Sequence, residues 1–278
     1  MTDGVVKATI LGSGSSGGVP RFGGADGAGD WGRCDPNEPK NRRTRCSLLV
    51  ERGTWPHGVT SVLIDTSPDM RAQLLAARCR HIDAVFYTHD HADQSHGIDD
   101  LRVFALAQRA RVPVYIDEET AGEIPRRFEY CFVQREGSWY PPVLERRDMP
   151  DCGASIEIDG EGGPVPVTPF LQNHGPVNSL GFRVGDIAYS SDVVGLPEES
   201  FAILEGVKTW IVDALQMKPH GTHAHLELAL EWIARVKPER AILTNLHVTM
   251  DYQTLKGMLP AGVEPAYDGL EVVGFVGR

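Results

Sequence analysis

The sequence predicts a mixed α/β protein, and two observations support this prediction. Short runs of aliphatic and β-branched residues, typical of strands, recur along all 278 residues. Residues 226–236 instead place Leu226, Ala229 and Ile233 on one face of a helix. No linker, low-complexity tract or internal repeat divides the sequence, so we expect a single domain over residues 1–278.

The first half of the chain has the pattern of strands joined by glycine-rich connections. The expected strands are residues 5–11, 46–51, 61–65, 84–88 and 112–116, and the expected helices are residues 70–78 and 101–109. Residues 12–18 are rich in glycine, but they lack Gly-Lys-Ser/Thr and the spacing of a dinucleotide fingerprint. We expect a tight turn after the first strand, and a contact between its amides and a substrate phosphate is left open.

The second half continues this pattern and adds the amphipathic helix. Its expected elements are strands 165–172, 209–215, 241–246 and 270–275, a hairpin over residues 181–190 with a turn at Gly185 and Asp186, and helices 226–236 and 254–258. Three expected strands lead into His89, His174 and His247, and the hairpin leads into Asp192. Loops held by a rigid scaffold are common places for functional side chains, so these four are candidate metal ligands.

Composition and charge exclude several classes of protein. The net charge of −11 argues against a general nucleic-acid binder, which needs clustered Lys and Arg to neutralise phosphates. The sequence contains no run of 18 apolar residues, so it predicts no membrane-spanning helix. The N-terminus lacks the pattern of a signal peptide, and we therefore expect a cytoplasmic protein. The five cysteines are odd in number and form no Cys-x-x-Cys pair, which argues against a disulfide framework or a cysteine-based zinc site.

Residues 88–97 form the densest group of candidate ligands. Three histidines and two aspartates fall within eight residues: His89, Asp90, His91, Asp93 and His96. Imidazole and carboxylate together suit zinc, manganese or iron. The alternative is a polar surface loop, which the apolar strand before it and the later histidines disfavour.

The spacing His89-x-His91-x-Asp93 after an apolar strand resembles the signature of the metallo-β-lactamase fold hydrolases. His174, Asp192 and His247 follow in the order in which that family places its later ligands. The opening residues 11–20 are similar to the branch that contains the phosphoribosyl cyclic phosphate phosphodiesterases. This branch is close to the tRNA 3′-processing nucleases and to a protein of pyrroloquinoline quinone biosynthesis. The resemblance implies a four-layer αββα sandwich with a metal centre at one edge of its sheets.

This sequence departs from the family pattern at two positions. The histidine that usually follows the aspartate is Gln94 here, which offers only a neutral oxygen as a ligand. A gapless match also places Asn245 at a metal-binding histidine, with His247 two residues later. Whether Gln94, His96 or Asn245 binds metal is left open. Both departures weaken the same half of a two-metal centre.

The resemblance implies a metal-dependent hydrolase, most simply a phosphodiesterase that acts on a small phosphodiester, cyclic ones included. It implies one or two divalent ions, zinc or manganese. The implied ligands are His89, His91 and His174 for a first ion, and Asp93, Asp192 and His247 for a second, with Asp192 bridging. The implied catalytic residues are His223, which protonates the leaving group, and Asp93, which orients the attacking water. A small-molecule substrate fits the acidic charge better than nucleic acid, and a homodimer is left open.

The sequence leaves open other candidates for the acid, a residue that supports a ligating histidine, and two other functions. His220 and His225 are weaker candidates for the acid, and Thr222 capping the following helix is the structural alternative for this segment. Asp65 follows a strand where relatives carry an aspartate that supports a ligating histidine. A non-hydrolytic metal-binding protein or an oxygenase of cofactor biosynthesis on the same fold is the second hypothesis. A degenerate binding protein that has lost one metal is the third, and Gln94 and Asn245 support it.

Overall fold

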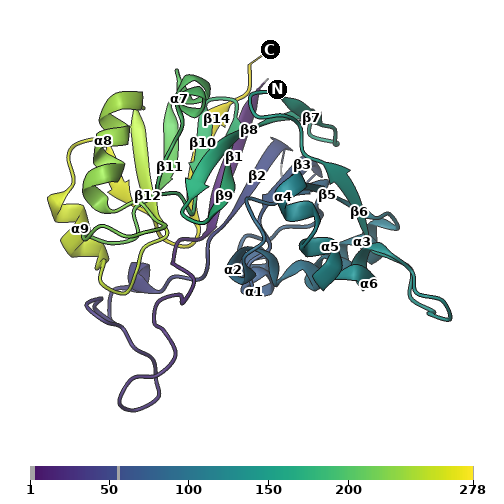
Figure 1. Cartoon of the computed structure of the whole chain (residues 1–278), viewed down its shortest axis with the longest axis horizontal. Helices are drawn as coiled ribbons and strands as arrows, with labels where there is room; N and C mark the ends of the chain where they lie inside the picture. Colours follow the sequence, from purple (N-terminus) through teal and green to yellow (C-terminus); the bar gives the residue numbers. More distant parts are fainter. Residues whose placement is uncertain (1–3, 55–56, 278) are drawn as a thin grey trace.

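The structure, a computed structural model, describes residues 4–54 and 57–277, and in them two seven-stranded sheets lie face to face (Figure 1). The first sheet has the order β14 (Leu270–Phe275), β1 (Val5–Gly12), β2 (Ser47–Thr54), β3 (His57–Ile64), β4 (Ala84–Phe86), β5 (Val112–Ile116) and β6 (Leu144–Asp148). The second has the order β13 (Val263–Pro265), β12 (Arg240–Thr244), β11 (Thr209–Asp213), β10 (Ile187–Ser190), β9 (Val177–Val184), β8 (Val165–His174) and β7 (Ile156–Ile158). Each sheet is part antiparallel and part parallel.

Helices cover the outer face of each sheet (Figure 1). Those on the side of the first sheet are α1 (Met70–Ala76), α2 (Ala92–Ser95), α3 (Arg102–Gln108), α4 (Glu118–Ala121), α5 (Ile124–Arg127) and α6 (Glu129–Phe132). Those on the side of the second sheet are α7 (Glu198–Leu204), α8 (Leu226–Val236) and α9 (Tyr252–Met258). Short 3-10 helices lie at Pro39–Asn41 and Ile98–Leu101. The αββα sandwich is confirmed.

The alternation of side chains along the strands builds the apolar layers. Ile10, Val62 and Phe86 of the first sheet point into the same buried cluster as Phe182 and Ile211 of the second. The rings of Phe86 and Phe182 meet edge to face with centroids 5.6 Å apart. Each fully buried side chain of this size contributes roughly 1.5–3 kcal/mol to folding. Two further clusters of buried apolar side chains lie between the outer faces of the sheets and the helices, so each sheet is buried on both faces.

The predicted elements and the observed ones agree best where the hydrophobic pattern is strongest. Strands 112–116 and 270–275, helix 226–236 and the hairpin turn at Gly185 and Asp186 are confirmed with these bounds. The helix predicted at 101–109 begins as the 3-10 helix Ile98–Leu101 and continues as α3. The prediction missed strands β6, β7 and β13 and helices α2, α4, α5, α6 and α7. The sequence of β6, Leu-Glu-Arg-Arg-Asp, shows why, since an exposed edge strand carries few apolar residues.

The glycine-rich segment after β1 is a close backbone crossing. A Cβ atom on Gly12 would lie 1.9 Å from the carbonyl oxygen of Arg45, so only glycine fits there. Gly14 pairs with both Arg45 and Leu246. The expected tight turn is confirmed, and it brings this segment beside the loop that follows β12.

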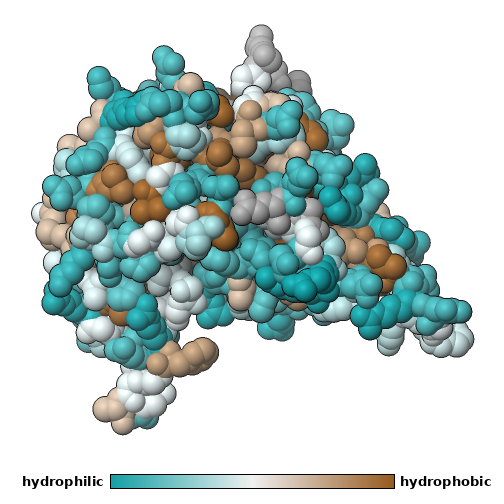
Figure 2. Space-filling model, viewed as in Figure 1, coloured by the Kyte–Doolittle hydropathy of each residue, from teal (hydrophilic) through white to brown (hydrophobic). Residues whose placement is uncertain are grey.

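The outer surface is mainly polar. On the face shown in Figure 2, hydrophilic side chains dominate and the apolar ones form small separate patches. Within residues 4–54 and 57–277, no helix is long and apolar enough to cross a bilayer.

Candidate metal centre

The polar side chains predicted to bind metal lie where strands of both sheets end at one edge. Strands β3 and β4 run parallel, and so do β10, β11 and β12, so their carboxyl ends meet there. Asp65, Asp192 and Asn245 follow β3, β10 and β12, and all three have left-handed backbones, with φ of 63°, 52° and 62°. Asp and Asn tolerate this conformation better than other non-glycine residues, and such backbones concentrate at functional sites.

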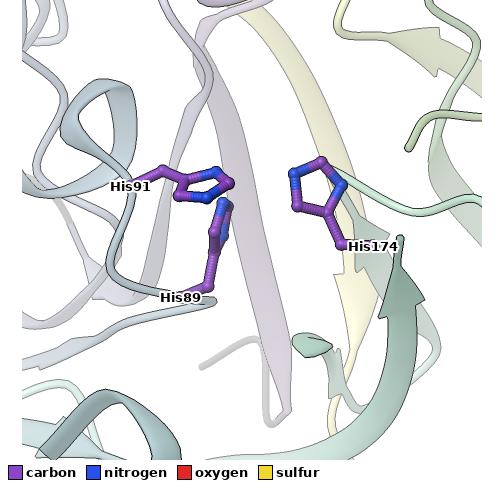
Figure 3. Close-up of side chains that lie close together, drawn as sticks. All are labelled: His89, His91 and His174. Atoms are coloured by element: carbon purple, nitrogen blue, oxygen red, sulfur yellow. The ribbon is translucent and has the colours of Figure 1, made fainter. Parts of the chain in front are cut away.

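Three histidines converge at this edge. One nitrogen each of His89, His91 and His174 lies within 4.8 Å of the other two, and the ring centroids are 4.4–5.2 Å apart. Figure 3 shows the rings of His89 and His91, from the loop after β4, facing that of His174 at the end of β8. His89 and His174 are buried, whereas His91 is exposed. Three imidazoles with an open fourth direction are a common arrangement for catalytic zinc.

The hydrogen bonds of His89 leave one nitrogen free for a metal. Asp65 accepts hydrogen bonds from both the backbone N–H and the hydroxyl of Thr88, and Thr88 Oγ1 lies 3.0 Å from Nδ1 of His89. Because the hydroxyl proton of Thr88 points at Asp65, Nδ1 of His89 donates to Thr88. Nε2 of His89 is buried without a hydrogen-bond partner. A buried, unpartnered acceptor costs free energy unless a ligand occupies it, and a divalent ion fits this requirement.

His174 is oriented in a similar way. Its Nδ1 lies 2.7 Å from the carbonyl oxygen of Thr222, which can only accept, so Nε2 is left as the free acceptor. Burial, together with the nearby His223, lowers the pKa of His174 to about 4. Burial and the imidazoles of His91 and His174 also hold the pKa of His89 well below its usual value. Both imidazoles are therefore neutral at pH 7, as a metal ligand must be.

A second group of donor atoms adjoins the three histidines. One donor atom each of His174, Asp192 and His223 lies within 4.8 Å of the others. Nδ1 of His223 lies 2.8 Å from Oδ2 of the fully buried Asp213. Burial alone would lower the pKa of His223, but the Asp213 carboxylate outweighs it and raises this pKa to about 9. Burial raises the pKa of Asp192 to about 6.

The remaining predicted ligands take different positions. The carboxylate oxygens of Asp93 belong to neither group of donor atoms, and burial and the Asp192 carboxylate raise the pKa of Asp93. His247 also lies outside both groups, and its Nδ1 is 3.0 Å from the hydroxyl of Thr249. Gln94 donates from Nε2 to Asp192 Oδ2 at 3.0 Å. The amide nitrogen of Asn245 lies 3.2 Å from Nδ1 of His223.

The other histidines of the two clusters lie at the margin. The ring of His96 packs edge to face on Phe128, away from the three converging imidazoles. The ring of His220 lies 5.3 Å from that of His223, and His225 is the residue before α8. The alternative that Thr222 caps α8 is wrong, because the helix begins four residues later, with His225 at the N-cap position, and Thr222 instead orients His174.

Two functional side chains escaped the sequence analysis. Thr88 connects Asp65 to His89, so the expected support of a histidine by Asp65 is indirect. Asp213 ends β11 in the run Thr-Trp-Ile-Val-Asp, and its only sequence signal is a carboxylate after four buried residues. A charged residue that directly follows a buried strand is a signal that could have found it.

Comparison with known proteins identifies the family. Residues 60–245 match the model described as beta-lactamase superfamily domain. The chain belongs to the beta-lactamase superfamily. A solved structure described as a new diphosphatase from the PhnP family is 31% identical, with a TM-score of 0.84 over 98% of each chain. Zinc-bound PqqB from Methylobacterium extorquens is 19% identical and shares the fold, with a TM-score of 0.72 over 96% of this chain and 99% of that one.

A curated protein with a similar sequence is longer than this chain. The octanoyltransferase of Porphyromonas gingivalis is 29% identical over 273 residues, which are 96% of this chain and 51% of the relative. The chain thus spans about half the length of that relative. The family match and the diphosphatase neighbour agree on the metallo-β-lactamase fold.

Proposed function

We propose that the protein is a metal-dependent phosphodiesterase acting on a small phosphodiester, cyclic ones included. One observation carries the proposal: three convergent histidine nitrogens lie beside a fourth histidine, His223, that a buried carboxylate keeps protonated. The first group can hold a divalent ion, and the second can deliver a proton. Hydrolysis of a phosphodiester requires both, because negative charge develops on the phosphoryl oxygens and on the leaving oxygen.

The donor set indicates which residues would hold the metal. His89, His91 and His174 supply three imidazole nitrogens, which suit zinc, and the nearby carboxylates also admit manganese. A divalent ion bound there would supply Lewis acidity, which activates water and neutralises phosphate charge. The buried, unpartnered Nε2 of His89 supports this assignment.

The chain's own residues account for the proton movements. Asp93, whose pKa is raised by burial and by the Asp192 carboxylate, accepts a hydrogen bond from the attacking water in this proposal and so orients it. His223 receives support on Nδ1 from Asp213, so its Nε2–H is free to protonate the departing alkoxide when the P–O ester bond breaks. The products are a phosphomonoester and an alcohol, and the imidazole recovers its proton from solvent.

The acidic surface supports a small substrate. A net charge of −11 repels long polyanions such as RNA, whereas a small phosphodiester carries little charge to repel. The diphosphatase described for the PhnP family is consistent with chemistry at phosphate esters or anhydrides.

A direct test measures metal content and hydrolysis of bis(p-nitrophenyl) phosphate together. His91→Ala should lose both bound metal and turnover, because it removes one of three ligands on which the site depends. His96→Ala is the matched control from the same loop, and it should keep both because its ring packs on Phe128. Full metal occupancy in His91→Ala would refute the ligand assignment, and metal binding with no phosphodiester turnover would refute the substrate class.

A second candidate function is a non-hydrolytic metal protein on the same fold. The observation that favours it is the presence of Gln94 and Asn245 in place of imidazoles. Iron in the purified protein with oxygen consumption would support it, whereas zinc or manganese with ester turnover would exclude it.

A further inference from the structure

The two carboxylate oxygens of Asp192 have different surroundings. Oδ2 accepts the hydrogen bond from Nε2 of Gln94 at 3.0 Å, and both residues are buried, with 3% and 1% of their surfaces exposed. Oδ1 lies 3.9 Å from Nε2 of His174 and 3.9 Å from Nε2 of His223. Only Oδ1 therefore faces the three-histidine cluster without a hydrogen bond to an amide.

The orientation of the Gln94 amide follows from electrostatics. Turning it over would set its carbonyl oxygen against the carboxylate of Asp192, two acceptors with no proton between them. With the nitrogen toward Asp192, Gln94 offers N–H groups at the position where an imidazole would offer a lone pair. A bridge through both oxygens of Asp192 would need Oδ2 as a ligand, and Gln94 occupies that oxygen.

Asn245, which follows β12 of the second sheet, also supplies an amide where the family pattern has a metal-binding imidazole. Its amide nitrogen lies 3.2 Å from Nδ1 of His223, the atom that is 2.8 Å from Oδ2 of Asp213. Its left-handed backbone, φ 62°, suits asparagine better than histidine. His247, two residues later, is turned toward Thr249 and does not replace the missing nitrogen.

We propose that the centre binds one metal ion, through His89, His91, His174 and Oδ1 of Asp192, and that Gln94 and Asn245 replace a second ion with hydrogen bonds. The inference rests on the proposed metal-dependent function and specifies its metal count. The Gln94 amide fixes the carboxylate of Asp192, and the contacts of Nδ1 with Asp213 and Asn245 hold His223 for proton transfer. These polar contacts perform the orienting role of a second cation.

Metal stoichiometry tests the inference without relying on activity. The whole chain is saturated with zinc or manganese, and ions per chain are counted by mass spectrometry under native conditions and by elemental analysis. Manganese EPR adds a second readout, because two adjacent ions give an exchange-coupled signal and one ion does not. The variant Gln94→His/Asn245→His restores both imidazoles. Gln253→His adds a histidine at an exposed position of α9 and controls for adventitious binding.

We expect one ion in the wild type and in Gln253→His, and two ions with a coupled manganese signal in the double variant. Two ions in the wild type would overturn the inference while leaving the proposed function intact. One ion in a folded double variant would overturn the roles assigned to Gln94 and Asn245. A wild type that binds no ion would overturn the proposed function, and the inference with it.

Discussion

Nδ1 of His223 and Oδ2 of Asp213 lie 2.8 Å apart, with Asp213 fully buried at the end of β11 and His223 in the loop before α8. This contact joins a proton-carrying imidazole to a carboxylate that solvent does not reach. Because the same carboxylate oxygen also accepts a hydrogen bond from the backbone N–H of Val193, its position is fixed by two donors. The geometry determines both which nitrogen of His223 faces the metal centre and how readily it gives up a proton.

Replacing Asp213 should move the alkaline limit of activity. A general acid works only while protonated, so activity falls as pH rises through its pKa. The Asp213 carboxylate raises the pKa of His223 to about 9, against burial, which lowers it. Asp213→Asn removes the negative charge, and the alkaline limb of the kcat/KM profile should shift to lower pH, toward or below the ordinary histidine value of about 6.5. An unshifted limb in a variant that retains its metal would show that His223 is not the titrating acid.

Removing His223 itself should affect poor leaving groups most. His223→Ala should retain bound metal and lose roughly 10²–10⁴-fold in turnover of an alkyl phosphodiester, the usual contribution of general acid–base catalysis. Esters of p-nitrophenol should lose much less, since nitrophenolate departs without protonation. Turnover is compared for the two ester classes with metal content measured in parallel. Equal losses on both would contradict the assigned role, and loss of metal would make His223 a ligand.

Removing the hydroxyl of Thr88 should weaken metal binding even though none of the metal-binding side chains is changed. The hydroxyl connects the carboxylate of Asp65 to Nδ1 of His89 and so directs Nε2 into the centre. Thr88→Val keeps the side-chain volume but removes this connection, and metal affinity should fall about 10–100-fold, as for other supporting partners of ligating histidines. Chelator competition measures the affinity. Thr88→Ser, which keeps the hydroxyl, should bind as tightly as the wild type, and equal affinity in both variants would exclude the relay.

The part of the centre that the sequence predicts is the part encoded by local spacing. His89 and His91 are separated by one residue in the loop that follows the buried strand β4, and this spacing is visible in the sequence. His174 ends β8 and Asp192 follows β10, and the family order predicts both as ligands. These positions follow from motifs that a single sequence displays.

The other features of the centre and of the fold depend on contacts between segments that are distant in the sequence. Gln94 is a neutral residue within a ligand motif, and whether its amide offers oxygen or N–H depends on Asp192, which is 98 residues away. Asp213 belongs to no motif, and its role appears only once the loop before α8 lies against the end of β11. The edge strand β6 escaped prediction for a related reason, because its pairing with β5 rather than its own pattern makes it a strand.

Asp251, the residue before α9, should make the free energy of unfolding depend on pH in the acid range. Its carboxylate accepts hydrogen bonds from the backbone N–H of Thr254, the amide of Asn41 and the backbone N–H of Asp35, so it joins α9 to the loop of residues 35–41. Partial burial would raise the pKa of Asp251, but these three donors outweigh it and lower the pKa to about 2. In the unfolded chain the group titrates near its usual value of about 3.9.

The sign of the effect follows from this difference. The folded state holds the deprotonated carboxylate more strongly, so its stabilisation is complete above about pH 4 and fades as pH falls through about 4 toward 2. Asp251→Asn keeps a competent cap for α9 but turns an amide toward two donors. Because the site is partly exposed to solvent, we expect Asp251→Asn to lower the free energy of unfolding by only about 1 kcal/mol at pH 7.

Urea unfolding of the wild type and Asp251→Asn at pH 7 and at pH 3 measures the effect, because contributions common to both proteins cancel in the difference. The difference in the free energy of unfolding should be smaller at pH 3 than at pH 7. The control Asp159→Asn changes an exposed aspartate of the same type and should show no such dependence. A difference that stays constant, or grows as the pH falls, would mean that the three donors do not hold Asp251 in its charged form.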